Sequence, residues 1–309
     1  MSCKKIGLLG GRGYVGQEII SLLNNNNDLN IGSVYSSSNA GQPVSMDASG
    51  EIIYQDLALD KIELADEEAF ILALPNKKSQ QYVDLIKNHN KEAIIVDLSS
   101  DHRFDKNWEY RIPELSDPVS SKKISNPGCY ASAMQFMIAP ILNILDGPVN
   151  LFGISGYSGA GASPNQRNNT ELLKDNILPY TLVKHLHEKE VQTHSYPDIL
   201  FTPHVGNFFR GIMITGNFFV SRQSDPKEIM NLFTDFYREM SLIFIQESPP
   251  NLQEVQNTSN VIIGGFEMDK AKNRLTFCCA LDNLLKGAAT QAVQNLNSAF
   301  GWDDNAGII

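Results

Sequence analysis

Cysteine is scarce in this chain of 309 residues, and its four cysteines show no spacing typical of disulfide or metal sites. They are Cys3, Cys129, Cys278 and Cys279. No CxxC pair occurs and no cysteine stands at metal-ligand spacing from a histidine, which excludes the usual zinc and redox motifs. The neighbours Cys278 and Cys279 are poorly placed to bridge each other, so we expect no disulfide scaffold. This usage predicts a cytoplasmic protein in a reducing compartment, without a bound metal.

Long hydrophobic runs and an excess of basic charge are also missing. No run of about 18 apolar residues occurs, so we expect no transmembrane helix. The first residues, Met1 to Lys5, lack the apolar core of a signal peptide and the length of a transit peptide. The 25 Lys and Arg are outnumbered by 35 Asp and Glu. This balance argues against a nucleic-acid surface or an anionic membrane as partner, but it allows a local site for an anionic small molecule.

Short apolar runs alternate with helical patterns in the first part of the chain. Buried strands of parallel type are expected at Lys5–Leu9, Leu29–Tyr35, Ala69–Leu74 and Ala93–Leu98, with helices at Tyr14–Leu23 and Ser79–Asn88. This alternation predicts an α/β fold with a Rossmann-type, doubly wound parallel sheet. We assign residues 1–128 to this domain.

The pattern changes to longer, alternating strands after Cys129. These strands are expected at Val149–Tyr157, Ile199–Pro203, Arg210–Val220, Val261–Met268 and Arg274–Ala280. Helices are expected at Ala131–Leu145 with a bend at Pro140, at Asp225–Phe244 and at Asn283–Phe300. The pattern predicts an α+β domain with a mixed sheet over residues 129–282, for catalysis, substrate binding and oligomerisation. We expect the C-terminal helix, within residues 283–309, to pack back on the first domain.

A glycine-rich turn follows the first strand and opens the first helix. Its glycines are spaced G-x-x-G-x-x-G, which lets the backbone approach a pyrophosphate at a helix N-terminus, although a tight turn alone is the alternative. The second strand ends in serines rather than in the carboxylate that holds the ribose of NAD, so we expect NADP(H). The cofactor contacts predicted here are Gly10, Arg12, Gly13, Tyr14, Val15 and Gly16, with Ser36, Ser37 and Ser38.

One cysteine stands at a predicted helix N-terminus. Pro127 and Gly128 break regular structure directly before Cys129, and an apolar helical run follows. Backbone N–H groups and the positive end of the helix dipole favour a thiolate there, and they can hold a developing oxyanion. The pattern therefore predicts a nucleophile, with a buried structural cysteine as the alternative.

Several motifs together resemble the N-acetyl-gamma-glutamyl-phosphate reductase family, within the aspartate-semialdehyde dehydrogenase-like superfamily. The resemblance covers nearly the whole chain. The motifs are GGRGYVG at Gly10, ALPN ending at Asn76, VDLSSDHRF from Val96, IPEL from Ile112, SNPGCYA around Cys129, GYSGAGASP from Gly156, HLHEKE from His185, TPHVGNFFRGI from Thr202 and DNLLKGAATQAVQN from Asp282.

The resemblance implies a reductase that works through a covalent intermediate. Cys129 would attack an acyl phosphate, phosphate would leave, and NADPH would deliver hydride to the resulting thioester, which collapses to an aldehyde. His185, the first histidine of the H-x-H-x-x-E segment, would be the general acid/base, although the residues alone fit a solvated polar helix equally well. His204 is the second candidate, with a hydrogen-bonded packing histidine near the substrate pocket as the alternative.

The resemblance also assigns the remaining site residues. Arg210 would bind phosphate or a substrate carboxylate through its guanidinium, with a surface ion pair as the alternative. Further cofactor contacts are expected at Pro75, Asn76, Ser158, Gly159, Asn283 and Lys286. Substrate contacts are expected at Asn126, Ser155, His187, Glu190, His204 and Arg210. For Glu190 the alternative is a carboxylate that orients the histidine.

The expected substrate is N-acetyl-L-glutamyl 5-phosphate, in arginine biosynthesis. Aminoadipyl phosphate of lysine biosynthesis and aspartyl phosphate are alternatives, since one methylene changes affinity by only about 1–3 kcal/mol. A non-catalytic NADP sensor and an aldehyde dehydrogenase that hydrolyses its thioester are further alternatives. Arg111 and Gly206-Asn207 depart from the family pattern, which bears on the shape of the substrate site. By analogy with relatives, we expect a homo-oligomer, either a dimer or a tetramer.

Overall fold

The chain divides into two compact units, which are described separately. The computed structural model describes residues 3–44, 52–221 and 224–309. The first unit is Met1–Pro127 together with Ala288–Ile309, and the second is Gly128–Gly287. Among the described residues, no helix combines the length and apolar character needed to cross a membrane.

The first unit is built on a seven-stranded sheet in which every pairing is parallel. Its strands are β1 (Lys4–Leu9), β2 (Leu29–Ser36), β3 (Tyr54–Asp56), β4 (Ala69–Leu72), β5 (Ile94–Asp97), β6 (Glu109–Tyr110) and β7 (Lys123–Ser125). Their order is β3-β2-β1-β4-β5-β7-β6. Strand order reverses between β1 and β4, the place where open α/β sheets form a crevice at their carboxyl ends. The predicted Rossmann-type sheet is confirmed.

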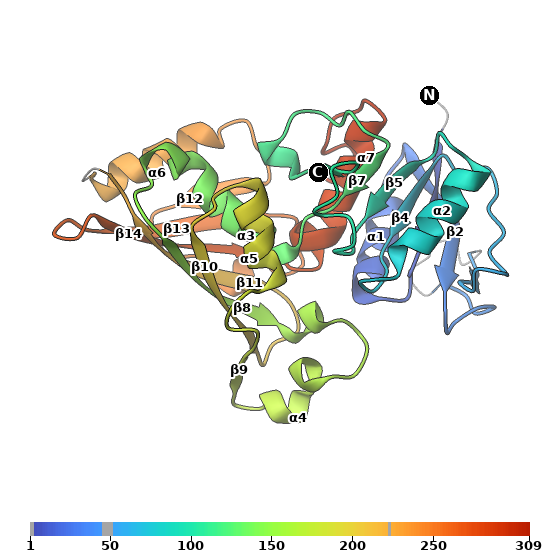
Figure 1. Ribbon diagram of the computed structural model, residues 1–309, viewed down its shortest axis with the longest axis horizontal. Helices are drawn as coiled ribbons and strands as arrows, with labels where there is room; N and C mark the ends of the chain where they lie inside the picture. Colours follow the sequence, from blue (N-terminus) through green and yellow to red (C-terminus); the bar gives the residue numbers. More distant parts are fainter. Residues whose placement is uncertain (1–2, 45–51, 222–223) are drawn as a thin grey trace. The chain divides into compact units, whose positions relative to one another are not determined.

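Helices cover both faces of this sheet (Figure 1). They are α1 (Tyr14–Asn24), α2 (Ser79–His89) and α7 (Thr290–Ala299), with a short 3₁₀ turn η1 (Pro113–Leu115). Ile20 of α1 and Leu296 of α7 share one core with Ile71 of β4. Ile86 of α2 shares the other core with Phe70, the neighbour of Ile71. Successive side chains of a strand point to opposite faces, so β4 supplies both cores and the sheet is doubly wound.

The second unit contains a mixed seven-stranded sheet, as the sequence predicts. Its strands are β8 (Val149–Gly156), β9 (Ile177–Pro179), β10 (Ile199–Gly206), β11 (Ile212–Phe219), β12 (Ile243–Gln246), β13 (Val261–Asp269) and β14 (Arg274–Leu281). They are ordered β12-β13-β14-β11-β8-β10-β9. The β8–β10 and β12–β13 pairs are parallel and the other pairs antiparallel.

Helices pack on one face of the second sheet (Figure 1). They are α3 (Cys129–Ile138), α5 (Leu186–His194) and α6 (Pro226–Phe236), with the 3₁₀ turn η2 (Ala139–Ile144). A second 3₁₀ turn, η5 (Leu252–Glu254), covers part of the opposite face, where Leu252 packs with Met213 and Ala280. Alternation along β8 and β10 leaves Phe152 and Leu200 on the other face, where they are 42% and 51% exposed. A sheet with one apolar face open to solvent is suited to pairing with another surface.

A loop region, residues 157–184, leaves the end of β8 and returns along the edge of the sheet. It contains η3 (Tyr157–Ala160), η4 (Gln166–Asn168), α4 (Thr170–Leu173) and β9. Figure 1 shows it reaching away from the strands of the second unit, with α4 near its tip. β9 pairs antiparallel with β10, so the chain comes back to the sheet directly before His185.

Three predicted helices differ from the observed ones. The helix predicted at Ala131–Leu145 is α-helical only to Ile138. It continues as the 3₁₀ turn η2, because Pro140 has no N–H to donate. The predicted helix Asp225–Phe244 ends at Phe236, and its last residues instead begin β12, which pairs with β13. The last helix begins as a π-helical turn, η6 (Leu285–Ala289), before α7.

Candidate active site

The glycine turn of the first unit leaves its backbone uncovered at the N-terminus of α1. Gly10 has a φ of +89°, and a Cβ there would lie 2.2 Å from the carbonyl oxygen of Ala73. A Cβ on Gly16 would lie 2.5 Å from the oxygen of Gly10, whereas Gly13, the N-cap of α1, meets nothing closer than 3.5 Å. The turn is therefore tightly folded on its inner side and open at the helix N-terminus, which fits a dinucleotide pyrophosphate.

The end of β2 presents hydroxyl groups beside this turn. Ser37, Ser38 and the side chain of Arg12 are exposed. Ser36 is buried instead, and its Oγ accepts the N–H groups of Ser38 and Asn39 at 3.3 and 3.2 Å. Ser36 therefore shapes the turn, and its predicted contact with the cofactor finds no support in this geometry.

Two further strand ends border the same edge of the sheet. Asp56 lies beside β2 at the end of β3, a carboxylate that the sequence analysis missed, and it pairs with Lys61 at 3.0 Å. Pro75 and Asn76 follow β4 and are exposed, and Asn76 Oδ1 accepts the N–H of Ser100 at 3.0 Å. The predicted residues of the first unit thus gather where β1, β2 and β4 end.

In the second unit, Cys129 is the first residue of α3 and is half-buried. The preceding Gly128 is extended, and its N–H donates to Oε1 of Glu190 at 2.7 Å. Glu190 lies on α5 and is fully buried. Its predicted role as a substrate contact is therefore not supported, because its carboxylate holds the turn that carries the thiol.

His185 is the N-cap of α5. Its Nδ1 accepts the backbone N–H of His187 at 3.1 Å, so the proton of the neutral ring resides on Nε2. Burial, reinforced by the positive charge of Arg167, lowers the pKa of His185 from 6.5 to about 4. The imidazole is therefore neutral near pH 7 and presents an Nε2–H donor.

Aromatic rings connect this imidazole with the thiol. The ring of His185 lies 5.6 Å from that of Tyr180, 5.4 Å from Phe201 and 6.4 Å from Tyr130, which follows Cys129 in the chain. Burial, followed by the charge of Cys129, raises the pKa of Tyr180 to about 12. The rings of Tyr130 and Tyr180 both lie near the imidazole, and Tyr130 directly follows Cys129. The structure therefore brings the two predicted catalytic residues into one neighbourhood.

The π-helical turn η6 approaches the same thiol. A Cβ on Gly287 would lie 2.7 Å from Cβ of Cys129, so no side chain fits there without displacing the cysteine. The preceding Lys286 is fully buried, with Nζ 5.6 Å from the centre of the Phe136 ring. Such π-turns are rare in proteins overall, and those that occur are often found at functional sites. The family resemblance predicts Lys286 as a cofactor contact, but no sequence pattern indicates the close approach of Gly287 to Cys129.

The small-residue loop after β8 is fastened to the segment before η6. Asn283 accepts the N–H of Gly211 at 2.6 Å and donates to Ser158 Oγ at 2.9 Å. A Cβ on Gly159 would lie 2.9 Å from Oγ of Ser155. The structure therefore brings together four predicted residues from two distant segments.

Family profiles match both units. One described as "Semialdehyde dehydrogenase, NAD binding domain" matches residues 5–122, and one described as "Semialdehyde dehydrogenase, dimerisation domain" matches residues 129–283. The chain belongs to the semialdehyde dehydrogenase family. The predicted family resemblance is thereby confirmed.

Relatives of this semialdehyde dehydrogenase identify its branch. It is 42% identical over 306 residues to N-acetyl-gamma-glutamyl-phosphate reductase of Xanthomonas axonopodis pv. citri, covering 97% of each chain. It is 40% identical to Protein arg11, mitochondrial, of Schizosaccharomyces pombe, covering 98% of this chain but only 35% of that longer protein.

Solved structures show the same fold at low identity. Aspartate semialdehyde dehydrogenase II of Vibrio cholerae, complexed with ASA, superposes with a TM-score of 0.82 at 16% identity, over 97% of this chain and 99% of that one. The Candida albicans enzyme with NADP gives 0.71 at 14% identity, over 99% and 100%.

Arg210 is already paired within the second unit of this semialdehyde dehydrogenase. Its Nε and Nη2 donate to the carboxylate of Asp282 at 2.5 and 3.1 Å. That buried carboxylate also accepts the N–H groups of Asn257 and Leu284. The ion pair balances the charge of Arg210, so the predicted grip on the substrate finds no support in the geometry.

His204 lies on the opposite face of β10 from the thiol. Its ring packs on Phe152 at 4.5 Å, whereas Phe201, an odd number of residues earlier on the strand, packs on Tyr130 at 4.9 Å. Since side chains alternate along a strand, His204 points away from Cys129. This geometry gives no support to the prediction of His204 as a second acid/base.

Asn126 belongs to the first unit and is buried there. Its Oδ1 accepts from Asn295 at 3.0 Å, and its Nδ2 donates to the carbonyl of Ala288 at 3.3 Å. Both the oxygen and the nitrogen of this side-chain amide thus hold the segment that contains α7. The predicted substrate contact is not supported.

Proposed function

We propose that this protein uses NADPH to reduce N-acetyl-L-glutamyl 5-phosphate to N-acetyl-L-glutamate 5-semialdehyde and phosphate, a step of arginine biosynthesis. The observation that carries the proposal is the thiol of Cys129 at the first position of α3, tied through Gly128 and Glu190 to the helix that His185 caps. The name of the Xanthomonas relative, 42% identical over nearly its full length, supports the choice of substrate.

The first half of the reaction forms a thioester. The thiolate of Cys129 attacks the acyl carbon of the acyl phosphate, the C–S bond forms, and the C–O bond to phosphate breaks with release of inorganic phosphate. Cys129 stands at the N-terminus of α3, where first-turn N–H groups and the helix dipole stabilise both the thiolate and the negative oxygen of the tetrahedral intermediate.

The second half releases the aldehyde. NADPH, when bound, supplies the hydride that the thioester carbon accepts. The Nε2–H of the neutral His185 ring donates a hydrogen bond to the developing alkoxide. The alkoxide then collapses to the aldehyde as the C–S bond breaks, which returns the thiolate of Cys129. The hydrogen bond from His187 N–H to Nδ1 fixes the tautomer that this donation needs.

NADPH rather than NADH is the proposed reductant. The open N-terminus of α1 at Gly13 would receive the pyrophosphate. Arg12, Ser37 and Ser38 are exposed beside it and would bind the 2′-phosphate by charge and hydrogen bonds. The nearby carboxylate of Asp56 is balanced by Lys61, which lowers its repulsion of a phosphate.

A homo-oligomer in the cytoplasm is the proposed working form. The open face of the second sheet exposes Phe152 and Leu200, and the family model over this unit is described as a dimerisation domain. All four cysteines are free thiols, which suits a reducing compartment.

A phosphate-dependent assay in the reverse direction tests the function. Purified protein receives N-acetyl-L-glutamate 5-semialdehyde, NADP and phosphate, and NADPH is followed by absorbance. We expect activity that requires phosphate, disappears in Cys129→Ala and persists in Cys278→Ala, a second half-buried thiol. Activity only with aminoadipate or aspartate semialdehyde would change the assigned substrate and leave the proposed reaction chemistry unchanged. Binding of NADP without activity on any of the three would contradict the proposal.

A further inference from the structure

Arg167 presents a cation beside the proposed catalytic pair. It lies in the 3₁₀ turn η4 of the loop region, is exposed, and holds its guanidinium carbon 4.9 Å from the centre of the Tyr180 ring. Within the described parts of the chain, no carboxylate forms an ion pair with it. Arg210, by contrast, is matched by Asp282.

A network of amide hydrogen bonds holds this arginine in place. Asn165 caps η4 by accepting the N–H of Arg167 at 3.0 Å and donates to the carbonyls of Ala160 and Ser163. Asn168 Nδ2 donates to the carbonyl of Gly161 at 2.8 Å. The turn is thus fastened to the small-residue loop after β8, and stacking on a ring orients the guanidinium further. The arginine is preorganised rather than loosely solvated.

The ring of Tyr180 links the guanidinium of Arg167 with the imidazole of the site. The ring of Tyr180 lies 5.6 Å from the ring of His185, and the charge of Arg167 contributes to the lowered pKa of that imidazole. Tyr180 also senses the charge of Cys129. Its backbone is fixed to the sheet by a hydrogen bond from its N–H to the carbonyl of Pro203 at 3.2 Å. Arg167, Tyr180, His185 and Cys129 therefore form one constellation within the second unit.

We propose that Arg167 is the subsite that receives an oxyanion group of the acyl substrate, either its phosphate or its carboxylate. This inference rests on the proposed function. A planar guanidinium that no carboxylate neutralises among the described residues is the side chain best matched to bidentate contact with either group. The sequence analysis gave this role to Arg210 and missed Arg167, because no spacing pattern relates residue 167 to the thiol.

Steady-state kinetics of the reverse reaction distinguish the two sources of the oxyanion. Phosphate and the semialdehyde, which keeps the carboxylate, are separate substrates in that direction. Arg167→Ala should raise KM for one of them by about tenfold or more, the loss expected for a charge-assisted contact. A rise for phosphate identifies the phosphate group, and a rise for the semialdehyde identifies the carboxylate. Unchanged KM values for both overturn the inference.

Two further variants guard against a general effect on folding. Lys174→Ala removes one exposed positive charge from the same loop region, at the C-cap of α4, and should leave both KM values within twofold. Arg167→Lys keeps the charge but loses the planar fork, so it should recover part of the affinity. An equal effect of Lys174→Ala and Arg167→Ala would overturn a specific role for Arg167.

Alkylation of Cys129 tests the same cation without any enzyme activity. The rates with iodoacetate, which is anionic, and iodoacetamide, which is neutral, are compared by mass spectrometry of the peptide that carries Cys129. Arg167→Ala should lower the iodoacetate-to-iodoacetamide rate ratio by about threefold or more, because a nearby cation attracts the anionic reagent. Should the wild-type protein lack reductase activity, this ratio alone decides, and an unchanged ratio overturns the inference.

Discussion

The carboxylate of Glu190 accepts the backbone N–H of Gly128 at 2.7 Å. The bond joins the turn that begins α3 with the helix that His185 caps, and both ends are buried. Because its carboxylate holds the turn that carries the thiol, Glu190 acts as a positioning residue. It sets where the nucleophile and the proton donor stand relative to each other.

Replacing Glu190 by alanine should lower kcat by about tenfold or more with KM changed less than twofold. Misplacement of a nucleophile by a fraction of an ångström affects the chemical step more than binding. The orphaned N–H of Gly128 should also lower the free energy of unfolding by about 1–3 kcal/mol. Steady-state kinetics and urea denaturation give both values.

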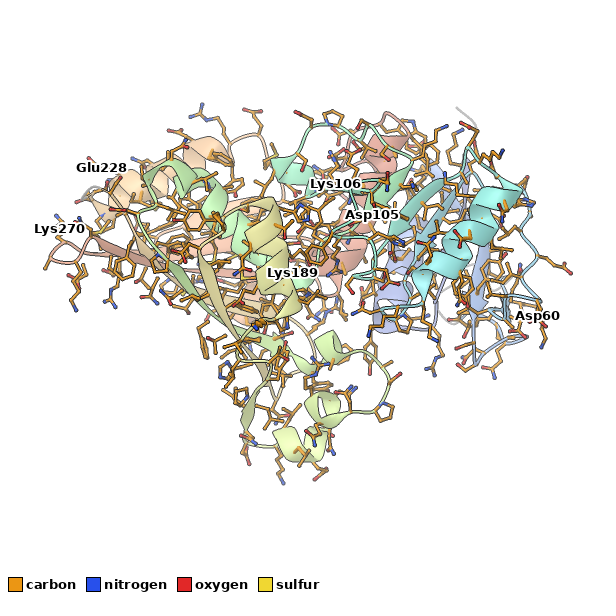
Figure 2. All side chains as sticks on the ribbon, in the orientation of Figure 1. Asp60, Asp105, Lys106, Lys189, Glu228 and Lys270 are labelled. Atoms are coloured by element: carbon orange, nitrogen blue, oxygen red, sulfur yellow. The ribbon has the colours of Figure 1, made fainter. Side chains whose placement is uncertain are left out.

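Two variants on the same position and helix separate this effect from general damage. Glu190→Gln keeps an oxygen that can accept the N–H, so it should retain most of kcat. Lys189→Ala changes an exposed neighbour on α5, labelled in Figure 2, and should behave as wild type. Loss of activity in Glu190→Gln equal to that in Glu190→Ala would show that the negative charge, not the hydrogen bond, matters.

Gly287→Ala should inactivate the enzyme while leaving NADP affinity unchanged. The new Cβ would lie 2.7 Å from Cβ of Cys129, so the cysteine must move. The φ of Gly287 lies outside the left-handed region, so the backbone itself accepts alanine. Overpacking of this kind costs about 1–3 kcal/mol of stability.

A double variant isolates that clash. In a Cys129→Gly background the opposing Cβ is absent, and the destabilisation by Gly287→Ala should largely disappear in thermal unfolding. A penalty of the same size in both backgrounds would place the strain elsewhere in the π-turn.

Much of the fold could be predicted from the sequence because its patterns are local. The apolar run before Gly10 and the glycine spacing identify β1 and α1 directly, and both begin within one residue of the expected position. The stretch Ile243–Phe244 was assigned to a helix because its apolar residues fit either period. Only its pairing with β13, which lies far along the chain, makes it a strand.

The site was less predictable because its contacts join distant segments. The thiol motif and the histidine segment are readable from residue type, but the bond between Glu190 and Gly128 spans 62 positions. The role of Arg111, which departs from the family pattern, was also hard to predict because its contacts join distant segments. This residue is buried in the first unit. Its guanidinium donates to Asp304 at 2.6 Å and Asn295 at 3.0 Å, so it stabilises the C-terminal segment.

Arg210→Ala should destabilise the second unit by about 3–5 kcal/mol, because it leaves the buried carboxylate of Asp282 without its cation. Arg274→Ala is the matched control, since Arg274 is 44% exposed and lies 4.0 Å from Asp269. That surface pair should contribute less than about 1 kcal/mol. Equal midpoints of the two variants in urea would contradict the assignment of Arg210 to the structure of this unit.

Acid should destabilise the protein through His185. The native imidazole has its pKa lowered from 6.5 to about 4 by burial and by Arg167. Above pH 6.5 both the native and the unfolded states carry it neutral. As the pH falls from 6.5 to 4, the unfolded chain binds a proton that the native state does not bind, so the free energy of unfolding falls by up to about 3 kcal/mol.

His185→Asn removes the titrating ring but keeps an oxygen that can cap α5. Urea denaturation at pH 7 and pH 4.5 should therefore show a smaller loss of stability in the variant than in wild type, and equal losses would mean that this imidazole is protonated in the native state.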